Sequence, residues 1–484
     1  MFWSRRRFNA GLGASLMSSA CGDTEPQANS ASQPAPTLHE RLHAEFVGAY
    51  PDDIGATGRV HEIELIAAPT RVQMGGRALE VWAYNGQVPG PTLRIRLGDT
   101  LKVRFINRLP TETTIHWHGV RVPNAMDGVP HVTQPPVRPS ETFLYEFTPK
   151  DAGTYWFHPH VRGSEQVERG LHGVLIVEDA QPSPYTQDVM WVVDDWRLDG
   201  TGQIDGRFNT RHDLAHDGRW GRLRTVNGAS DETLKVRPGE RIRLRMLNCA
   251  NGRMIVPHFG SLEPKVLAVD GKYLRAPIPL RRFEMAPGNR LDLDIAFERD
   301  VSEVVTVLDD FYPRRATGIA TIEIDGDPVE TPTFKAPAQA HVPVWREGLD
   351  ARLHHDYRMN ARAGGTHGIE WMFDNEPFSG HDQHKVSSSL IRHEFHRIRF
   401  SNDSARLHPI HMHGMFFRLL ARNGEPVDEP FFRDTVLVHG RETVDLGVVP
   451  TDVGQWMVHC HILEHAEAGM MTLVEVRDSG PARS

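Results

Sequence analysis

Four pairs of histidines, each pair separated by a single residue, are the residues of this chain best placed to do chemistry. They are His116/His118, His158/His160, His411/His413 and His459/His461. On an extended strand, residues two apart face the same side, so each pair presents two imidazoles in one direction. One zinc or copper ion usually takes four ligands, so eight imidazoles are too many for a single ion. The spacing therefore predicts a small cluster, here of three metal ions.

The last pair encloses a cysteine, Cys460, whose thiolate should point to the opposite face of the strand. Further ligands stand ready on that side: His408, His465 and Met470. Two histidines, one cysteine and a weak axial methionine form the ligand set of a blue-copper electron-transfer site. Because Cys460 is flanked by His459 and His461, a one-electron centre would be joined covalently to the cluster. Four coppers could store the four electrons that dioxygen needs to become water.

An internal repeat shows which elements must position these residues. Thr92–Asn107 aligns without a gap on Thr233–Asn248, and His393–Asn402 is a third, weaker copy. Each copy alternates polar and apolar residues, as a half-buried strand does. A histidine pair follows the first and third copies, whereas the second is followed only by His258. The first and third units are therefore expected to share one metal site, with the second as a copper-free spacer.

Length and composition agree with an all-β chain of several domains. The 484 residues exceed one ordinary core, and 34 prolines with 42 glycines favour short strands and turns. We expect three consecutive β-sandwich domains. Their predicted boundaries are 41–182, 183–335 and 336–484. The net charge of −9 argues against nucleic-acid binding.

The first 40 residues are interpreted as an export signal and a flexible linker. Ser4–Phe8 contains three arginines and resembles a twin-arginine signal, and the apolar stretch after it is too short to span a membrane. Cys21 either leaves with the signal or carries a lipid, although Ser18 stands where a lipobox usually has an aliphatic residue. The protein is expected to be exported to the periplasm or the cell surface, touching a membrane only through such a lipid.

Four motifs, HWHG, HPH, HPIHMHG and HCHILEHAEAGM, resemble those of the multicopper oxidases, in particular the three-domain bacterial laccase-like and copper-resistance group. The resemblance implies cupredoxin-like Greek-key domains and four copper ions: one type 1, one type 2 and two type 3. It assigns the type 1 copper to His408, Cys460, His465 and Met470, and the type 2 copper to His116 and His411. It assigns one type 3 copper to His118, His158 and His461, and the other to His160, His413 and His459.

The resemblance also implies how protons reach the cluster. Asp127 matches an acidic residue beside the type 2 copper, and we expect it to deliver protons; the alternative is that it shapes the turn before Gly128. Many bacterial relatives carry a glutamate directly after the residue matching His465. This chain has Ala466 there and Glu467 next, which puts that second proton route in doubt.

Three functions are compatible with the motifs. The first is oxidation of phenols or aromatic amines by dioxygen, carried out by a monomer. The second is oxidation of Cu(I) in copper tolerance. It is weakened by the absence of a methionine-rich insert and by the sequence Asn402–Leu407 before His408, in which only Asp403 is acidic. The third is a copper-free cell-division scaffold, which the complete ligand set disfavours.

Overall fold

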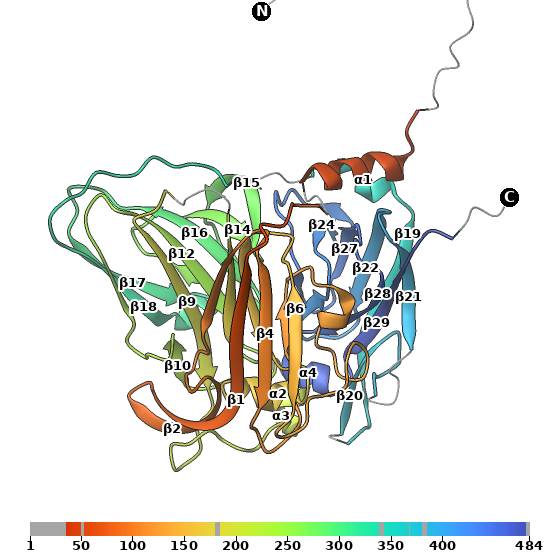
Figure 1. Cartoon of the computed structure of the whole chain (residues 1–484), viewed down its shortest axis with the longest axis horizontal. Coiled ribbons are helices and arrows are strands. Elements are labelled where there is room, and N and C mark those ends of the chain that lie inside the picture. The colour runs from red at the N-terminus through yellow and green to blue at the C-terminus, as the bar shows by residue number, and fades with distance from the viewer. Residues whose placement is uncertain are drawn as a thin grey trace, which may run out of the picture. The chain divides into compact units, whose positions relative to one another are not determined.

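The computed structural model describes residues 35–49, 53–179, 184–337, 343–366, 368–379 and 385–480, so most of the predicted signal and linker lies outside it. The described chain forms pairs of β-sheets in sequence order (Figure 1). Within the described residues, no helix is long and apolar enough to cross a membrane.

The first pair of sheets has the strand orders β2-β1-β4-β6 and β3-β8-β7-β5. Between their facing surfaces lies a core that includes Phe105, Trp117 and Tyr145. The strands are β1 (Val60–Met74), β2 (Arg77–Tyr84), β3 (Thr92–Arg96), β4 (Thr100–Asn107), β5 (His116–His118), β6 (Thr142–Phe147), β7 (Gly153–His158) and β8 (Gly173–Glu178), with a 3₁₀ turn η1 (Asn124–Met126) and helix α2 (Gly163–Glu168).

The second pair has the orders β10-β9-β12-β16-β14-β15 and β11-β18-β17-β13, around a separate core that includes Trp191 and Leu244. Its elements are β9 (Gln187–Trp196), α3 (Arg211–Ala215), β10 (Leu223–Val226), β11 (Thr233–Val236), β12 (Arg241–Asn248), β13 (Pro257–His258), β14 (Lys265–Val269), β15 (Lys272–Pro279), β16 (Arg290–Ala296), β17 (Glu303–Asp309), η2 (Pro313–Arg315) and β18 (Thr317–Ile324).

The third pair has the orders β20-β19-β22-β27-β24-β25 and β21-β29-β28-β23-β26, and its core includes Phe400 and Cys460. Its elements are η3 (Arg346–Asp350), β19 (Leu353–Ala363), β20 (Ile369–Phe373), β21 (Val386–Ile391), β22 (His396–Asn402), β23 (His408–Met412), β24 (Phe417–Arg422), β25 (Glu425–Pro426), β26 (Thr435–Val438), β27 (Thr443–Val448), β28 (Gly454–Cys460), α4 (Leu463–Glu467) and β29 (Met471–Arg477).

The three sandwiches repeat one topology. The first strand of each, β1, β9 or β19, pairs in parallel with β4, β12 or β22. In the opposite sheets, β3, β11 and β21 pair in parallel with β8, β18 and β29. The sequence repeat coincides with β3–β4, β11–β12 and β22, so the predicted all-β fold of three consecutive cupredoxin-like sandwiches is confirmed.

A short helix before the first sandwich, α1 (Leu38–Ala49), packs on the third (Figure 1). Thr37 and Glu40 form a capping box: the Glu40 carboxylate accepts from Thr37 N–H, and Thr37 Oγ1 accepts from Glu40 N–H. Leu42 and Phe46 are buried in a cluster with Trp345. Trp345 Nε1 donates to the Leu42 carbonyl at 2.9 Å, which fixes the helix in place.

Candidate metal centre

Cross-strand pairing brings the histidine pairs together two at a time. β5 pairs antiparallel with β7, which places His116 opposite His158. β23 pairs antiparallel with β28, which places His411 opposite His459. The middle residues point the other way, as the strand period requires: Trp117 and Met412 belong to the cores of the first and third sandwiches.

The last residue of each sequence repeat anchors the chain that follows it. Asn107, Asn248 and Asn402 are all buried. Each donates through Nδ2 to two backbone carbonyls beyond its strand and accepts an N–H from two residues ahead. In the first and third sandwiches this turn leads towards the histidine strands β5 and β23. The repeated Asn therefore fixes the path by which each histidine pair approaches the centre.

The eight paired histidines meet in one cluster between the first and third sandwiches. His116 stacks on His413 with ring centroids 3.7 Å apart, and His118 stacks on His411 at the same separation. His160 Nε2 lies 3.4 Å from His459 Nε2, which in turn lies 3.2 Å from His413 Nε2. Seven of the eight are buried and His160 is intermediate. Sites for a metal ion are indicated by three groupings of ligand nitrogens: His116/His411/His413, His116/His118/His158 and His160/His413/His459.

Hydrogen bonds fix which nitrogen of most rings faces the cluster. Nδ1 of His116, His158, His411 and His459 each lies 2.8–3.0 Å from a backbone carbonyl oxygen, which can only accept a hydrogen bond, so Nδ1 carries the proton. Nδ1 of His413 lies 2.8 Å from the Asp127 carboxylate. Nε2 of these five rings is therefore free for a metal. The buried His158 Nε2, His118 Nδ1 and both His461 nitrogens have no hydrogen-bond partner, as metal ligands should.

Electrostatics keep these imidazoles neutral. Burial lowers the pKa of His118, His158, His160, His413, His459 and His461 well below 6.5, and neighbouring histidines lower it further. Burial also lowers the pKa of His465 to about 3. Neutral imidazole is the form that binds metals.

A second group lies on the other side of β28. Cys460 Sγ is 3.6 Å from His408 Nδ1 and 3.8 Å from His465 Nδ1, and the two Nδ1 atoms are 3.2 Å apart. All three residues are fully buried, as is Met470. Burial raises the pKa of the Cys460 thiol, so a bound cation is needed to stabilise its thiolate. The donor set of thiol and two imidazoles fits copper.

The outer nitrogens of this second group have partners that the sequence motifs do not mark. Ser404 Oγ lies 2.9 Å from His408 Nε2. His465 Nε2 donates to the carbonyl of His216 at 2.7 Å, just after helix α3 of the second sandwich. Because both histidines are fully buried, a reductant cannot touch either ring directly.

Asp127 lies at the cluster and not only in a turn. It is fully buried, its Oδ2 accepts from His413 Nδ1 at 2.8 Å, and its Oδ1 lies 3.3 Å from His116 Nδ1. Glu467 lines a cavity of about 240 Å³ together with His160 and Arg162, and burial raises its pKa to about 7. A carboxyl group therefore reaches the neighbourhood of the cluster even though residue 466 is alanine.

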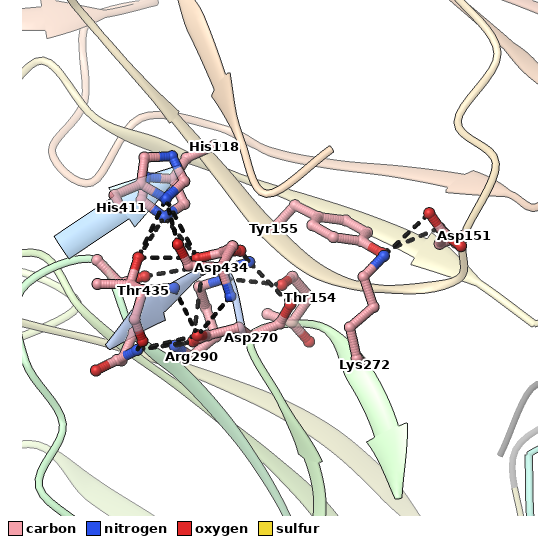
Figure 2. Close-up of polar contacts among 12 residues, drawn as sticks. His118, Asp151, Thr154, Tyr155, Asp270, Lys272, Arg290, His411, Asp434 and Thr435 are labelled. Carbon is pink, nitrogen blue, oxygen red and sulfur yellow. Dashed lines mark hydrogen bonds and ion pairs between the residues drawn. The ribbon is translucent and has the colours of Figure 1, made fainter. Parts of the chain in front are cut away.

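A buried network of charged residues lies against His118 and His411 (Figure 2). The sequence motifs did not predict it. Asp434 Oδ1 accepts from His118 Nε2 at 3.1 Å, and Arg290 of the second sandwich binds both Asp434 oxygens at 3.0 and 2.6 Å. Asp270 Oδ2 accepts the backbone N–H groups of Asp434 and Thr435. Burial would raise the pKa of Asp434, but the positive charge of Arg290 holds it well below its usual range.

The sandwich fold, the imidazole cluster and the thiolate site together define a copper-binding redox protein. Two family models, both described as multicopper oxidase, match residues 67–182 and 353–480. A multicopper oxidase structure from Pseudomonas parafulva is 33% identical, covering 86% of this chain and all of that one, with a TM-score of 0.78. The chain belongs to the multicopper oxidase family, and like its members it is a copper-dependent oxidoreductase.

Further relatives are named as multicopper oxidases, laccases or copper resistance proteins. A multicopper oxidase of Mycobacterium tuberculosis is 27% identical over 462 residues, which is 87% of this chain and 88% of that protein. A laccase structure from Pediococcus acidilactici is 28% identical, covers 88% of this chain and 92% of that one, and has a TM-score of 0.74. A copper resistance protein A homologue of Pseudomonas syringae is 24% identical, with 98% and 99% coverage.

Proposed function

We propose that this oxidase takes single electrons from phenols or aromatic amines and passes them to dioxygen, which becomes water. The observation that supports it most directly is the position of Cys460. It groups with His408 and His465, while its sequence neighbours His459 and His461 belong to the histidine cluster. Bound copper supplies one-electron transfer at the first site and dioxygen reduction at the second.

The proposed ligands follow the family's pattern and comprise four ions. The type 1 copper is assigned to His408, Cys460, His465 and Met470. The grouping of His160, His413 and His459 supports one type 3 site. The second type 3 site is assigned to His118, His158 and His461. Each of these rings has at least one buried nitrogen without a hydrogen-bond partner, which supports the assignment. His116 and His411, with Nε2 atoms 3.4 Å apart, are assigned to type 2 copper.

The residues around the metals have separate tasks. Nδ1–H of His413 and His459 is held by an acceptor, which keeps each Nε2 directed at the cluster. Asp127 is the proposed proton donor for dioxygen reduction, since its carboxylate contacts His413 and His116 without exposure to bulk water.

The same proposal covers location and organisation. We propose that residues 1–40 direct export to the periplasm or the cell surface, where Cys21 either is removed with the signal or carries a lipid. We also propose that the mature protein is a monomer. The proposed domain boundaries remain 41–182, 183–335 and 336–484. The ranges of the three sheet pairs, 60–178, 187–324 and 353–477, support this division.

One structural feature favours Cu(I) as a second candidate reductant. The segment that covers His465 carries two exposed histidines, His212 and His216, whose ring centroids are 4.3 Å apart. The His216 carbonyl accepts from His465 Nε2. A cation bound by these imidazoles would therefore contact His216, a residue that is hydrogen-bonded to the proposed type 1 ligand His465. That hydrogen bond gives its electron a path to the type 1 site.

A cysteine substitution tests the main proposal. The copper-loaded protein should contain about four coppers per chain and be blue from the Cys460 thiolate. Cys460→Ser should lose the blue band and oxidase activity while the histidine cluster keeps its copper. Metal analysis and visible spectroscopy measure both effects, with Cys249→Ser, a buried free cysteine, as the matched control. A blue Cys460→Ser protein, or zinc in place of copper, would refute the assignment.

The reductant is tested with a panel of a methoxyphenol, an aromatic amine and Cu(I). Turnover of the first two without added copper is expected. A His212→Ala/His216→Ala variant should leave phenol oxidation unchanged if Cu(I) is a separate donor. If only Cu(I) is oxidised, and the double variant loses that rate, the second candidate replaces the first.

A further inference from the structure

Six of the cluster histidines have a ring orientation fixed by a hydrogen bond to an oxygen acceptor, and His118 is the one among them that is held through Nε2. Five rings are fixed through Nδ1, which leaves Nε2 for a metal. His118 is fixed through Nε2, 3.1 Å from Asp434 Oδ1, and its buried Nδ1 has no hydrogen-bond partner. Since a carboxylate can only accept, Nε2 of His118 carries the proton and Nδ1 offers its lone pair.

Asp434 is itself held by Arg290, which lies at the start of β16 in the second sandwich. All five N–H donors of this guanidinium have acceptors. Nε donates to the carbonyl of Thr154 in the first sandwich, and Nη1 and Nη2 each donate to a carbonyl of the second sandwich. The remaining two bind the Asp434 carboxylate of the third. Arg290 therefore joins all three sandwiches at one buried point.

Asp270 fixes the other side of Asp434. Its Oδ2 accepts the backbone N–H groups of Asp434 and Thr435, both at 3.2 Å. Its Oδ1 accepts the backbone N–H of Arg290 at 3.0 Å. Thr435 Oγ1 donates to Asp434 Oδ1 at 2.9 Å. The carboxylate oxygen that faces His118 is therefore oriented by two donors, Thr435 and Arg290. Figure 2 shows these side chains converging below the His118–His411 stack.

Two glycines lie where this network and the cluster histidines leave no room for a side chain. A Cβ on Gly119, the glycine of HWHG, would lie 2.2 Å from Arg290 Nη2 and 2.4 Å from Asp434 Oδ2. A Cβ on Gly288 of the second sandwich would lie 3.0 Å from His118 and 3.1 Å from His461. Both glycines have positive φ, which disfavours any side chain.

We infer that Asp434, clamped by Arg290, is a positioning residue that holds His118 in the tautomer whose Nδ1 faces the cluster. The copper-free second sandwich thereby completes the trinuclear site and is more than a spacer. This inference rests on the proposed copper ligands. Acceptors that orient ligating histidines typically change metal affinity by about 10- to 100-fold.

The test is Asp434→Asn, with Asp292→Asn as a matched control. Asp292 is an equally buried carboxylate of β16 that binds Arg243 and Thr154, and no hydrogen bond or ion pair links it to a cluster histidine. Asp434→Asn should stay blue but bind cluster copper about 10- to 100-fold more weakly. Chelator titration measures this, and electron paramagnetic resonance should show uncoupled Cu(II) as the type 3 pair is broken. Asp292→Asn should keep all its copper.

Arg290→Lys is the second variant, because lysine keeps the charge but cannot bind both carboxylate oxygens in a fork. It should show the same weakening to a smaller degree. Full cluster occupancy in either variant contradicts the inference. Equal copper loss in Asp292→Asn, or loss of the blue band in both variants, also contradicts it, because the network would then be structural only. A wild-type protein without four coppers would instead reject the proposed function.

Discussion

At the scale of single residues, hydrogen-bond acceptors decide what each imidazole can do. A cluster histidine is useful only if one nitrogen is free and aimed inward. Backbone carbonyls supply the acceptor for His116, His158, His411 and His459, whereas carboxylates supply it for His118 and His413. The two carboxylates, Asp434 and Asp127, are therefore the positions where a side-chain substitution can alter the cluster without removing a ligand.

Asp127 gives the first residue-scale prediction. In Asp127→Asn the amide nitrogen can replace Oδ1, which has no hydrogen-bond partner, while the carbonyl oxygen still accepts from His413 Nδ1. Both oxygens of Asp434 already accept hydrogen bonds, so Asp434→Asn lacks this option. Asp127→Asn should therefore retain its copper and its rate of reduction by substrate. Reoxidation by dioxygen should slow about 100-fold, the low end for loss of a positioned general acid. Stopped-flow reoxidation of the reduced protein measures it. Asp53→Asn, an exposed turn carboxylate, is the control. An unchanged reoxidation rate would return Asp127 to a role in its turn.

At the scale of elements, helix α1 packs the start of the described chain against the third sandwich. Phe46 is 2% exposed and packs against Trp345, Phe416 and Phe432. Glu45 accepts the backbone N–H groups of residues 344 and 345. Apolar packing supplies most of the stability of so short a helix.

Phe46→Ala should therefore lower the free energy of unfolding by about 3 kcal/mol, the low end for a buried phenylalanine. Denaturant unfolding measures the loss. Val47→Ala changes the neighbouring residue, which is 46% exposed, and should cost much less. Equal effects of the two substitutions would show that α1 does not depend on this contact.

A pair of side chains between the second and third sandwiches makes stability depend on pH. His439 Nε2 lies 2.9 Å from the Glu284 carboxylate. This hydrogen bond raises the pKa of His439 and lowers that of Glu284. The histidine contribution is present below its unfolded pKa of about 6.5 and is lost as pH rises through the folded value. The glutamate contribution is lost as pH falls below about 4.3.

His439→Gln should accordingly lower the thermal midpoint most between about pH 4.5 and 6.5, and little at pH 8.5. Because both side chains are partly exposed, the loss should stay below about 1 kcal/mol. Thermal scans at pH 5.5 and 8.5 test this. His258→Gln, at an exposed histidine, should show no such dependence. A difference as large at pH 8.5 would mean that packing, not charge, explains the effect.

At the scale of the whole molecule, metals should add to the contacts that hold the first and third sandwiches together. The cluster takes four histidines from the first sandwich and four from the third, and several buried nitrogens lack any other partner. Ligands that bind only the folded state stabilise it by mass action, by roughly 4 kcal/mol at 1,000 times the dissociation constant.

Copper removal should therefore lower the unfolding midpoint, and adding copper back should restore it. Calorimetry of the loaded, stripped and reloaded protein measures both steps. Stripped Asp434→Asn should gain less from reloading than stripped Asp292→Asn. An identical midpoint with and without copper would show that the ion cluster does not hold the sandwiches together.

Sequence alone determined the parts that depend on local periodicity. The repeat ending in Asn107, Asn248 and Asn402 predicted three similar sandwiches, because strand alternation is written directly in the order of residues. The histidine pairs and Cys460 predicted one metal cluster and one thiolate site for the same reason. A capping box at Thr37–Glu40 could also have predicted α1, although its partner on the third sandwich could not have been found that way.

Only the tertiary structure decided which distant residues contact the proposed metal ligands. Arg290 and Asp434 are 144 positions apart and stand in no common motif, yet their ion pair fixes the orientation of His118. The covering of His465 by His216 is likewise a contact across 249 positions. Such contacts depend on how three sandwiches pack, and packing is set by side chains from all of them at once. A local pattern can specify a ligand, but the acceptor that orients it comes from wherever the fold brings a carboxylate or carbonyl within hydrogen-bond distance.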